Sequence, residues 1–139
     1  MSVLVTGSFD LLHSGHIAFL KEASVYGKLY VGIGSDASIT SLKGRPTIFT
    51  QEERLFMISA IKYVEFAWIN SGMGNFDFFD DIFKHNVFID KLVVNEDQNF
   101  IEKRKFCERH GMRYIVLNRK PELGMPVRSS TDIRKYYDR

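Results

Sequence analysis

Two histidines, His13 and His16, stand three residues apart and follow a run of small residues. Side chains three positions apart lie on the same face of a helix, so both imidazoles would turn toward the same ligand. Thr6, Gly7 and Ser8 precede them, and small residues let the backbone approach a ligand closely. The unpaired N–H groups and partial positive charge of a helix N-terminus attract phosphate. This stretch therefore predicts a polyphosphate-binding site.

A strand and a helix must hold these residues in place. Residues 3–5 form an apolar run that is too short for a helix and typical of a buried strand. From Ile17 onward the pattern becomes helical, with Ile17, Leu20 and Ala23 on one face. The sequence thus predicts a strand, a tight loop and a helix whose first turn carries both histidines.

The alternation of strand and helix continues along the chain. Further apolar, β-rich runs predict strands at residues 29–33, 64–69, 91–94 and 114–117, with helical patterns between most of them. Strands that alternate with helices form right-handed βαβ units and a parallel sheet covered on both faces. We expect one domain over residues 1–139 with an α/β fold, a Rossmann-like α/β/α sandwich around a parallel sheet of about five strands.

Polar residues follow the carboxyl ends of two predicted strands, where open α/β sheets bind ligands. Asp36 follows the second strand, and residues 95–97 follow the fourth. Asp36 could contact a ligand or cap the next turn. Residues 38–49 are expected to form a loop around Lys43.

Four further helices are predicted, and the last would begin within residues 128–134, which suit N-capping. Thr50 and Glu53 form a capping-box pattern, and Arg54 lies in the first turn of that helix. A cation there opposes the helix dipole, which favours an anion-binding role for Arg54. A second helix would begin at Asn75, and the charged residues of a third, at residues 99–110, are expected to face solvent. The second helix would carry phenylalanines into the core at helical spacing: Phe76, Phe79 and Phe83.

Charge and cysteine usage narrow the classes of function. The chain carries a formal net charge of only +2, so its bulk charge does not support a nucleic-acid partner. Cys107 is the only cysteine, which excludes an internal disulfide and a cysteine-rich zinc site. The sequence has neither a secretory leader pattern nor an apolar run of membrane length. We expect a cytoplasmic protein that binds neither a membrane nor nucleic acid.

The run TGSFDLLHSGH, at residues 6–16, resembles the signature of the cytidylyltransferase-like nucleotidyltransferase superfamily, whose fingerprint is a His-x-Gly-His turn. Residues 34–36, Lys43, residues 53–54 and the Ser-Ser-Thr run at 129–131 fall in the order and rough spacing of that family. The resemblance covers nearly the whole chain. It is strongest to glycerol-3-phosphate cytidylyltransferase and to the adenylyltransferase domain of ADP-heptose synthase.

The resemblance implies that a nucleoside triphosphate and a phosphate-bearing acceptor react to give a nucleotidyl product and pyrophosphate. The acceptor oxygen would attack the α-phosphorus in line, a reaction that needs positioning and charge neutralisation more than a protein nucleophile. The implied catalytic residues are His13, His16, Lys43 and Arg128. The implied nucleotide-binding residues are Thr6, Gly7, Ser8, Phe9, Asp10, Gly15, Asp97, Arg119, Ser129, Ser130, Thr131 and Arg134. The implied acceptor-binding residues are Asp36, Lys43 and Arg54.

The resemblance also implies ligands and assembly. We expect CTP as the donor and a small phosphate or phosphonate, such as glycerol phosphate, as the acceptor. The alternative is ATP with a sugar phosphate or FMN, and a nucleotide-binding module without turnover is a more distant one. Mg²⁺ would bind through the triphosphate oxygens, with no metal ligand from the protein, and the chain would form a homodimer. A dinucleotide-dependent oxidoreductase is disfavoured because its Gly-x-Gly-x-x-Gly loop is missing.

Because the chain departs from the family pattern at several positions, the identity of the nucleobase stays undecided. Arg119 follows the last predicted strand, whereas Arg128 adjoins the serines, so either could be the arginine of the family pattern. The glycine that usually precedes the serines is absent, and Gln98 stands where an aromatic residue is usual.

Overall fold

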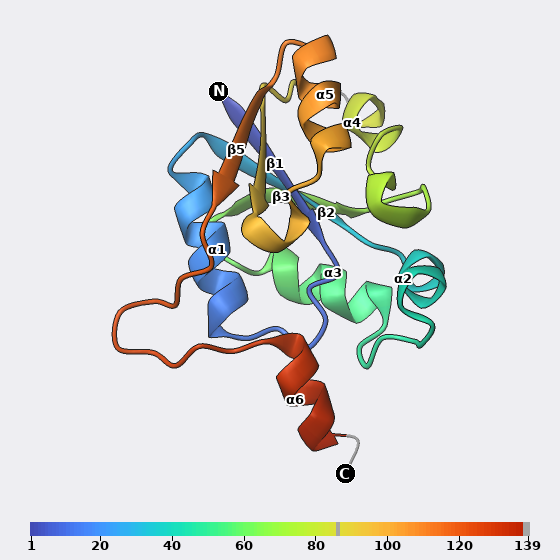
Figure 1. Cartoon of the computed structure of the whole chain (residues 1–139), viewed down its shortest axis with the longest axis vertical. Helices are drawn as coiled ribbons and strands as arrows, with labels where there is room; N and C mark the ends of the chain where they lie inside the picture. The colour runs from blue at the N-terminus through green and yellow to red at the C-terminus, as the bar shows by residue number, and fades with distance from the viewer. Residues whose placement is uncertain (86, 138–139) are drawn as a thin grey trace.

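A parallel five-stranded sheet forms the centre of the computed structural model, which describes residues 1–85 and 87–137 (Figure 1). The strands pair in the order β3-β2-β1-β4-β5, and each pairing is parallel. They are β1 (Ser2–Gly7), β2 (Lys28–Ile33), β3 (Val64–Ile69), β4 (Lys91–Asn95) and β5 (Arg113–Leu117). The Rossmann-like fold and the five strands predicted from the sequence are confirmed.

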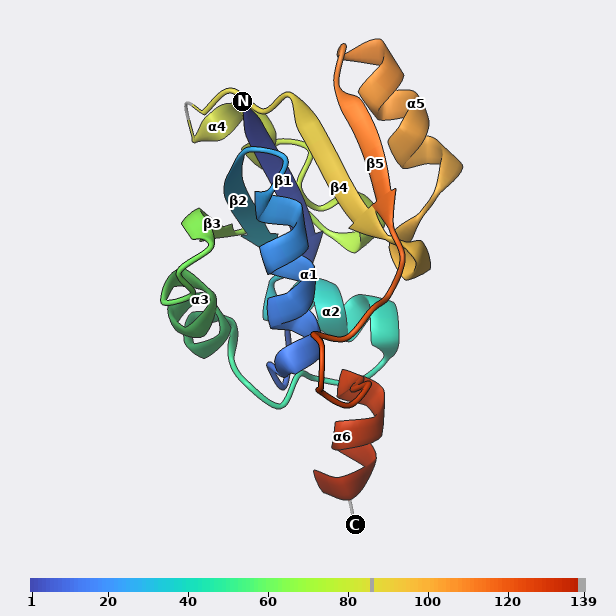
Figure 2. The same cartoon turned by 90° about the vertical axis from the view of Figure 1, so that its left-hand side faces the viewer.

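Helices cover both faces of this sheet (Figure 2). They are α1 (Ser14–Ser24), α2 (Asp36–Lys43), α3 (Gln51–Ser59), α4 (Asp81–Lys84), α5 (Ile101–Arg109) and α6 (Ser130–Tyr137), with single 3₁₀ turns at η1 (Gly74–Phe76) and η2 (Glu96–Gln98). Side chains of β1 alternate between the faces: Val3 and Val5 pack in one core with α1 and α3, and Leu4 packs in the other with α4 and α5. None of these helices is long and apolar enough to cross a membrane.

The helix α2 replaces part of the loop expected at residues 38–49. The Ser35 side chain accepts a hydrogen bond from the Ser38 N–H (3.1 Å) and so caps the helix. Gly44, with a φ of 71°, ends it in the left-handed conformation that glycine adopts readily. Few of its residues are apolar and buried, so the helix lacks the apolar stripe on which the sequence-based prediction relied.

The long aromatic helix predicted from Asn75 is also wrong. The segment breaks into η1, a turn and the short α4. Phe76 and Phe79 do pack against the core, but Phe83 is 67% exposed and Phe78 is the fully buried phenylalanine. Ring contacts with Phe106 of α5 therefore decide the conformation here, because local periodicity alone would have placed Phe83 inside.

The sheet has a topological switch point between β1 and β4. From β1 the chain moves outward through α1 to β2 and then to β3, and it returns to the far side of β1 to form β4 and β5. The loops after β1 and β4 therefore diverge toward opposite faces. In open α/β sheets the crevice that this leaves at the carboxyl ends of the strands is where ligands bind.

Arg54 of α3 joins the loops at this end of the sheet, and its side chain is fully buried. Its Nη1 donates to the carbonyl oxygens of Ser8 (2.6 Å) and Gly34 (2.8 Å), which follow β1 and β2. Its Nε donates to the carbonyl of Phe49 (3.1 Å), and its Nη2 pairs with Asp36 Oδ1 (2.8 Å). These contacts satisfy the buried charge and tie α3 to the edge of the crevice.

Replacing Arg54 should cost much of the stability of the fold. Arg54→Met keeps the apolar length of the side chain but leaves three carbonyl oxygens without their donor, so we expect the free energy of unfolding to fall by about 3 kcal/mol or more. Urea denaturation measures this change. Arg109→Met, which removes an exposed arginine at the end of α5, is the matched control. Equal losses in the two variants would contradict a structural role for Arg54.

Candidate active site

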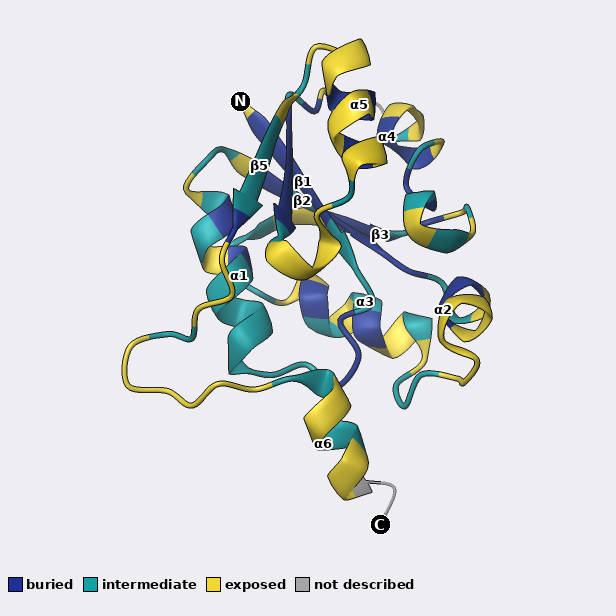
Figure 3. Ribbon diagram, viewed as in Figure 1, coloured by how far each residue is buried: buried dark blue, intermediate teal, exposed yellow. Residues whose placement is uncertain are grey.

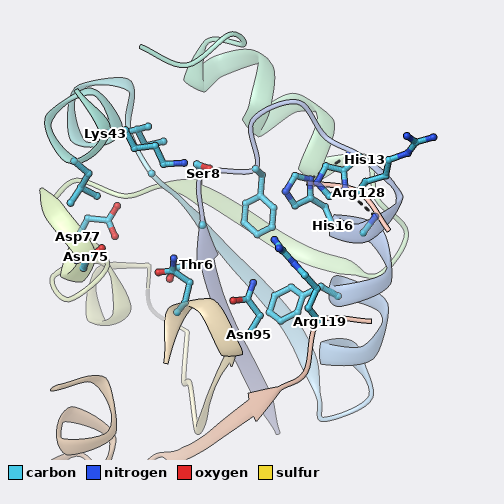
Figure 4. A pocket seen from close by; sticks show the side chains of 18 of the residues that line it. Thr6, Ser8, His13, His16, Lys43, Asn75, Asp77, Asn95, Arg119 and Arg128 are labelled. Carbon is cyan, nitrogen blue, oxygen red and sulfur yellow. Dashed lines mark hydrogen bonds between the residues drawn. The ribbon is translucent and has the colours of Figure 1, made fainter. Parts of the chain in front are cut away.

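A cavity of about 490 Å³ opens at the carboxyl ends of β1, β2 and β4, at the switch point (Figure 4). Its volume is in the range of small-molecule binding sites. The structure brings to its walls ten of the residues predicted from the sequence: Thr6, Gly7, Ser8, Phe9, His13, Gly15, His16, Lys43, Arg119 and Arg128.

His13 and His16 occupy the first turn of α1 as a stacked pair, with ring centroids 3.8 Å apart. The backbone N–H of Gly15 donates to Nδ1 of His13 (3.0 Å), and the backbone N–H of His13 donates to Nδ1 of His16 (3.2 Å). Each Nδ1 therefore acts as an acceptor, which leaves each ring proton on Nε2 when the imidazole is neutral. Both histidines line the cavity, so the pair can present N–H donors to an anion there.

The glycine between the histidines is required by this stacking. A Cβ built on Gly15 would lie 2.9 Å from Cε1 and 3.0 Å from Nδ1 of the His13 ring. Any larger residue would push that ring away from His16. The His-x-Gly-His spacing therefore has a packing reason in addition to its chemistry.

The loop between β1 and α1 is strained and is held by a buried carboxylate. Phe9 and Leu11 have φ angles of 51° and 52°, a left-handed conformation that residues other than glycine rarely adopt. Asp10 accepts backbone hydrogen bonds from Ile48 (2.8 Å), Phe49 (2.9 Å) and Leu11 (3.1 Å). Asp10 thus fastens the loop to the segment before α3, and this role explains its position beside the site.

The histidines are held in their neutral form. Burial, the neighbouring His13 and the charges of Arg119 and Lys43 lower the pKa of His16 to about 3. Burial and the charges of Arg119 and Arg128 also lower the pKa of His13. Arg119, Arg128 and Lys43 therefore make this side of the cavity electropositive. An electropositive wall beside two imidazole N–H donors suits a polyphosphate.

The predicted phosphate-binding residues of α6 line a smaller neighbouring hollow. Ser130, Thr131 and Arg134 lie around it with Asp10, and Ser8 and Lys43 line both hollows. The Ser130 hydroxyl donates to the carbonyl of Asp10 (2.6 Å), which attaches the start of α6 to the strained loop. The rest of α6 projects from the body of the protein (Figure 3). The contact of Ser130, Thr131 and Arg134 with the β- and γ-phosphates stays a prediction.

Four predicted site residues lie outside both hollows. Asp36 and Arg54 bind each other, and the partners of the Arg54 guanidinium are backbone carbonyls and Asp36, so the structure does not support acceptor binding by Arg54. Asp97 pairs with Arg119 (3.4 Å) on the surface. Ser129 caps α6 by accepting from the Asp132 N–H (3.1 Å). Arg119 and Arg128 both line the cavity, so the structure leaves both as candidates for the family arginine.

Sequence reasoning missed three polar residues that line the cavity: Asn75, Asp77 and Lys103. Lys103 was expected on a solvated helix face, yet it is 1% exposed. A signal was present, because Lys103 stands three and four residues before the buried Phe106 and Cys107 and so shares their face of α5. Asp77 gave no comparable signal, since it lies within the aromatic run whose helix does not form.

A protein-held metal site is not formed by the residues of the two described ranges. No group of three or more histidine, cysteine, aspartate or glutamate side chains gathers there in a way that could hold a metal ion. The Mg²⁺ predicted from the family resemblance would bind through phosphate oxygens, and that prediction is not tested by this arrangement.

The lowered pKa of His16 should make the stability of the free protein depend on pH. Histidine has a pKa near 6.5 in the unfolded chain and about 3 in the folded one, so below pH 6.5 the unfolded chain binds more protons. The stability that the folded protein keeps while His16 is neutral is therefore fully present above pH 6.5, and it is lost as the pH falls toward 3. Urea denaturation between pH 7 and pH 5 should show a steeper loss for the wild-type protein than for His16→Gln. Equal slopes would contradict the buried, neutral histidine.

Comparison with known proteins places the chain in a family. The family model described as cytidylyltransferase-like matches residues 4–136. A protein of Picrophilus torridus named FAD synthase is 33% identical over 97% of this chain and 94% of its own length. A protein of Methanocella paludicola with the same name is 33% identical over 96% of this chain and 93% of its own length.

A solved structure agrees with this assignment. The lipopolysaccharide core biosynthesis protein from Thermoplasma volcanium superposes with a TM-score of 0.71 at 28% identity, over 88% of this chain and 98% of that one. The matching family model, the full-length relatives and the shared fold lead to one conclusion: this chain belongs to the cytidylyltransferase-like nucleotidyltransferase family.

Proposed function

We propose that this protein is an FMN adenylyltransferase, which transfers AMP from ATP to the phosphate of FMN and so forms FAD and pyrophosphate. The observation that carries the choice of substrates is that relatives matching nearly the full chain are named FAD synthase. FAD consists of FMN joined to AMP through a diphosphate, which is the type of product that a nucleotidyltransferase makes. The cavity volume and the electropositive histidine side are compatible with two phosphate-bearing substrates.

The proposal replaces CTP, the donor expected from the sequence, with ATP. The sequence motifs that favoured a cytidylyltransferase bind the triphosphate and do not read the base. The chain also departs from the family pattern at Gln98 and before the serines, so the motifs do not fix the choice of base. The relatives therefore favour the alternative, ATP with FMN as the acceptor, over CTP with glycerol phosphate.

The reaction would proceed by in-line displacement at the α-phosphorus of ATP. An oxygen of the FMN phosphate forms the new P–O bond, and the bond from the α-phosphorus to the bridging β-oxygen breaks as pyrophosphate leaves. Negative charge grows on the α-phosphate oxygens and on that leaving oxygen. His13 and His16, through their Nε2–H groups, would donate to these oxygens.

Cations would neutralise the phosphates of both substrates. Arg119 and Arg128 stand on the histidine side of the cavity, where the triphosphate would lie (Figure 4). Lys43 lines both hollows and so can hold the acceptor phosphate next to the α-phosphate. Mg²⁺ bound to the triphosphate would supply further charge neutralisation. Together these groups position two anions that would otherwise repel each other.

The decisive experiment offers ATP or CTP together with FMN, glycerol phosphate or a sugar phosphate. Pyrophosphate release and chromatographic detection of the product are measured with Mg²⁺ present. We expect FAD from ATP and FMN and a much lower rate with CTP. A product formed with CTP but not with ATP would indicate a cytidylyltransferase instead. ATP binding without turnover for any acceptor would instead indicate the binding module.

His16→Gln should lower kcat for FAD synthesis by about 10² to 10³, the usual loss when one donor to a developing oxyanion is removed. The fold should survive, because glutamine can still accept from the His13 N–H at the start of α1. His110→Gln is the matched control, since His110 ends α5 and does not line the cavity. A His16→Gln rate within about twofold of wild type would remove His16 from the mechanism.

A further inference from the structure

Two buried residues of opposite charge line the cavity and have no part in the proposed chemistry. Asp77 follows η1 and is 8% exposed, and Lys103 of α5 is 1% exposed. Figure 4 shows Asp77 beside Asn75 on one side of Thr6, with His13 and His16 on the other. The cavity therefore has a histidine side and an Asp77 side, which are separated by the end of β1.

Asp77 and Lys103 face the same cavity without forming a direct ion pair, although both side chains lie within the described part of the chain. Lys103 Nζ donates to the carbonyl of Gln98 (3.3 Å) and lies 5.1 Å from the centre of the Phe100 ring. Burying a charge is costly, and a pair held apart recovers little of that cost through mutual attraction. The fold therefore gains little from this pair, which favours a role in binding.

Both groups keep most of their charge at neutral pH. Burial raises the pKa of Asp77 to about 6, an effect that the nearby Asn70 and Lys103 oppose. Burial lowers the pKa of Lys103 to about 8, and the charge of Asp77 opposes this. At pH 7 the carboxylate is thus mainly an acceptor and the ammonium group mainly a donor. Asn75 adds an amide at the same end of the cavity.

We propose that Asp77 and Lys103 recognise the isoalloxazine ring of the flavin acceptor, an inference that rests on the function proposed above. The pyrimidinedione edge of that ring presents a carbonyl, an N3–H and a second carbonyl. Asp77 accepts from N3–H, Lys103 donates to one carbonyl, and the Asn75 amide donates to the other. A donor–acceptor–donor set whose Asp77 and Lys103 are buried selects a ring that pairs with them and rejects one that leaves them unpaired.

The flavin fits this end better than the nucleotide does. A carboxylate repels phosphate, so the triphosphate belongs on the histidine side with Arg119 and Arg128. Adenine then lies near Asn95 and Arg119, which stand closer to the histidines in Figure 4. The acceptor phosphate reaches the α-phosphate beside Lys43, and its ring extends toward Asp77. The apolar side chains of Ile39 and Leu42, which line the same cavity, are available to contact the ring faces.

The test measures binding of each substrate separately in Asp77→Asn and Lys103→Met. The Kd of FMN is obtained from quenching of flavin fluorescence, with the ATP site filled by an analogue that has a methylene bridge between the α- and β-phosphorus atoms. The Kd of that analogue is measured by calorimetry. We expect FMN binding to weaken about tenfold or more while analogue binding changes less than about twofold. Asp80→Asn and Lys105→Met, which alter exposed residues outside the cavity, should leave both constants unchanged.

A flavin analogue gives the same test without a mutation in case a variant does not fold. FMN methylated at N3 lacks the donor for Asp77, so the wild-type protein should bind it about tenfold more weakly than FMN. Asp77→Asn, where folded, should discriminate less between the two flavins.

Three results would overturn the inference while FAD synthesis stands. The first is unchanged FMN binding in both variants, and the second is a loss of binding of the ATP analogue alone. The third is equal binding of FMN and N3-methyl FMN by the wild-type protein. Failure of the wild-type protein to form FAD would instead overturn the proposed function itself.

Discussion

The buried guanidinium of Arg54 is the interaction on which the geometry of the site depends. It binds the backbone after β1 at Ser8 and after β2 at Gly34, and it pairs with Asp36 at the start of α2. These segments are distant in sequence but form one rim of the cavity. An arginine suits this position because its planar fork offers several donors in fixed directions.

A second constraint acts on the loop that carries the histidines. Phe9 and Leu11 adopt left-handed backbone conformations, which persist only where the surroundings impose them. Asp10 imposes them through its backbone hydrogen bonds, and α6 adds a contact through Ser130. The result is a fixed, stacked histidine pair, whose Nε2–H groups would donate to phosphate oxygens in the proposed reaction. Preorganised donors act without further cost when charge develops, which is how electrostatic catalysis accelerates phosphoryl-type transfer.

The cavity thus combines two electrostatic environments across the end of β1. On one side, neutral imidazoles and arginines form an electropositive wall that suits an anion. On the other, a buried carboxylate and a buried ammonium group line the cavity, and we propose that they bind a neutral ring. Lys43 stands at the border of the main cavity and the smaller hollow. This division suits a reaction that joins two phosphates, because the phosphates must meet while the rest of each substrate is bound elsewhere.

The sequence by itself determined the five strands, the order of the elements and the turn that carries His13 and His16, because each depends on local periodicity or on residues adjacent in the chain. It also identified the nucleotidyltransferase family, since the His-x-Gly-His motif lies within one helix turn. The contact of Gly15 with the His13 ring and the stacking of His13 on His16 are therefore local. Only the tertiary structure decided that Arg54 supports the rim rather than a ligand, and that Lys103 turns inward beside Asp77. Those outcomes depend on contacts between distant segments, which no local pattern encodes. Local motifs do not choose between CTP and ATP for a similar reason, because the cavity is lined by several loops that are distant in sequence.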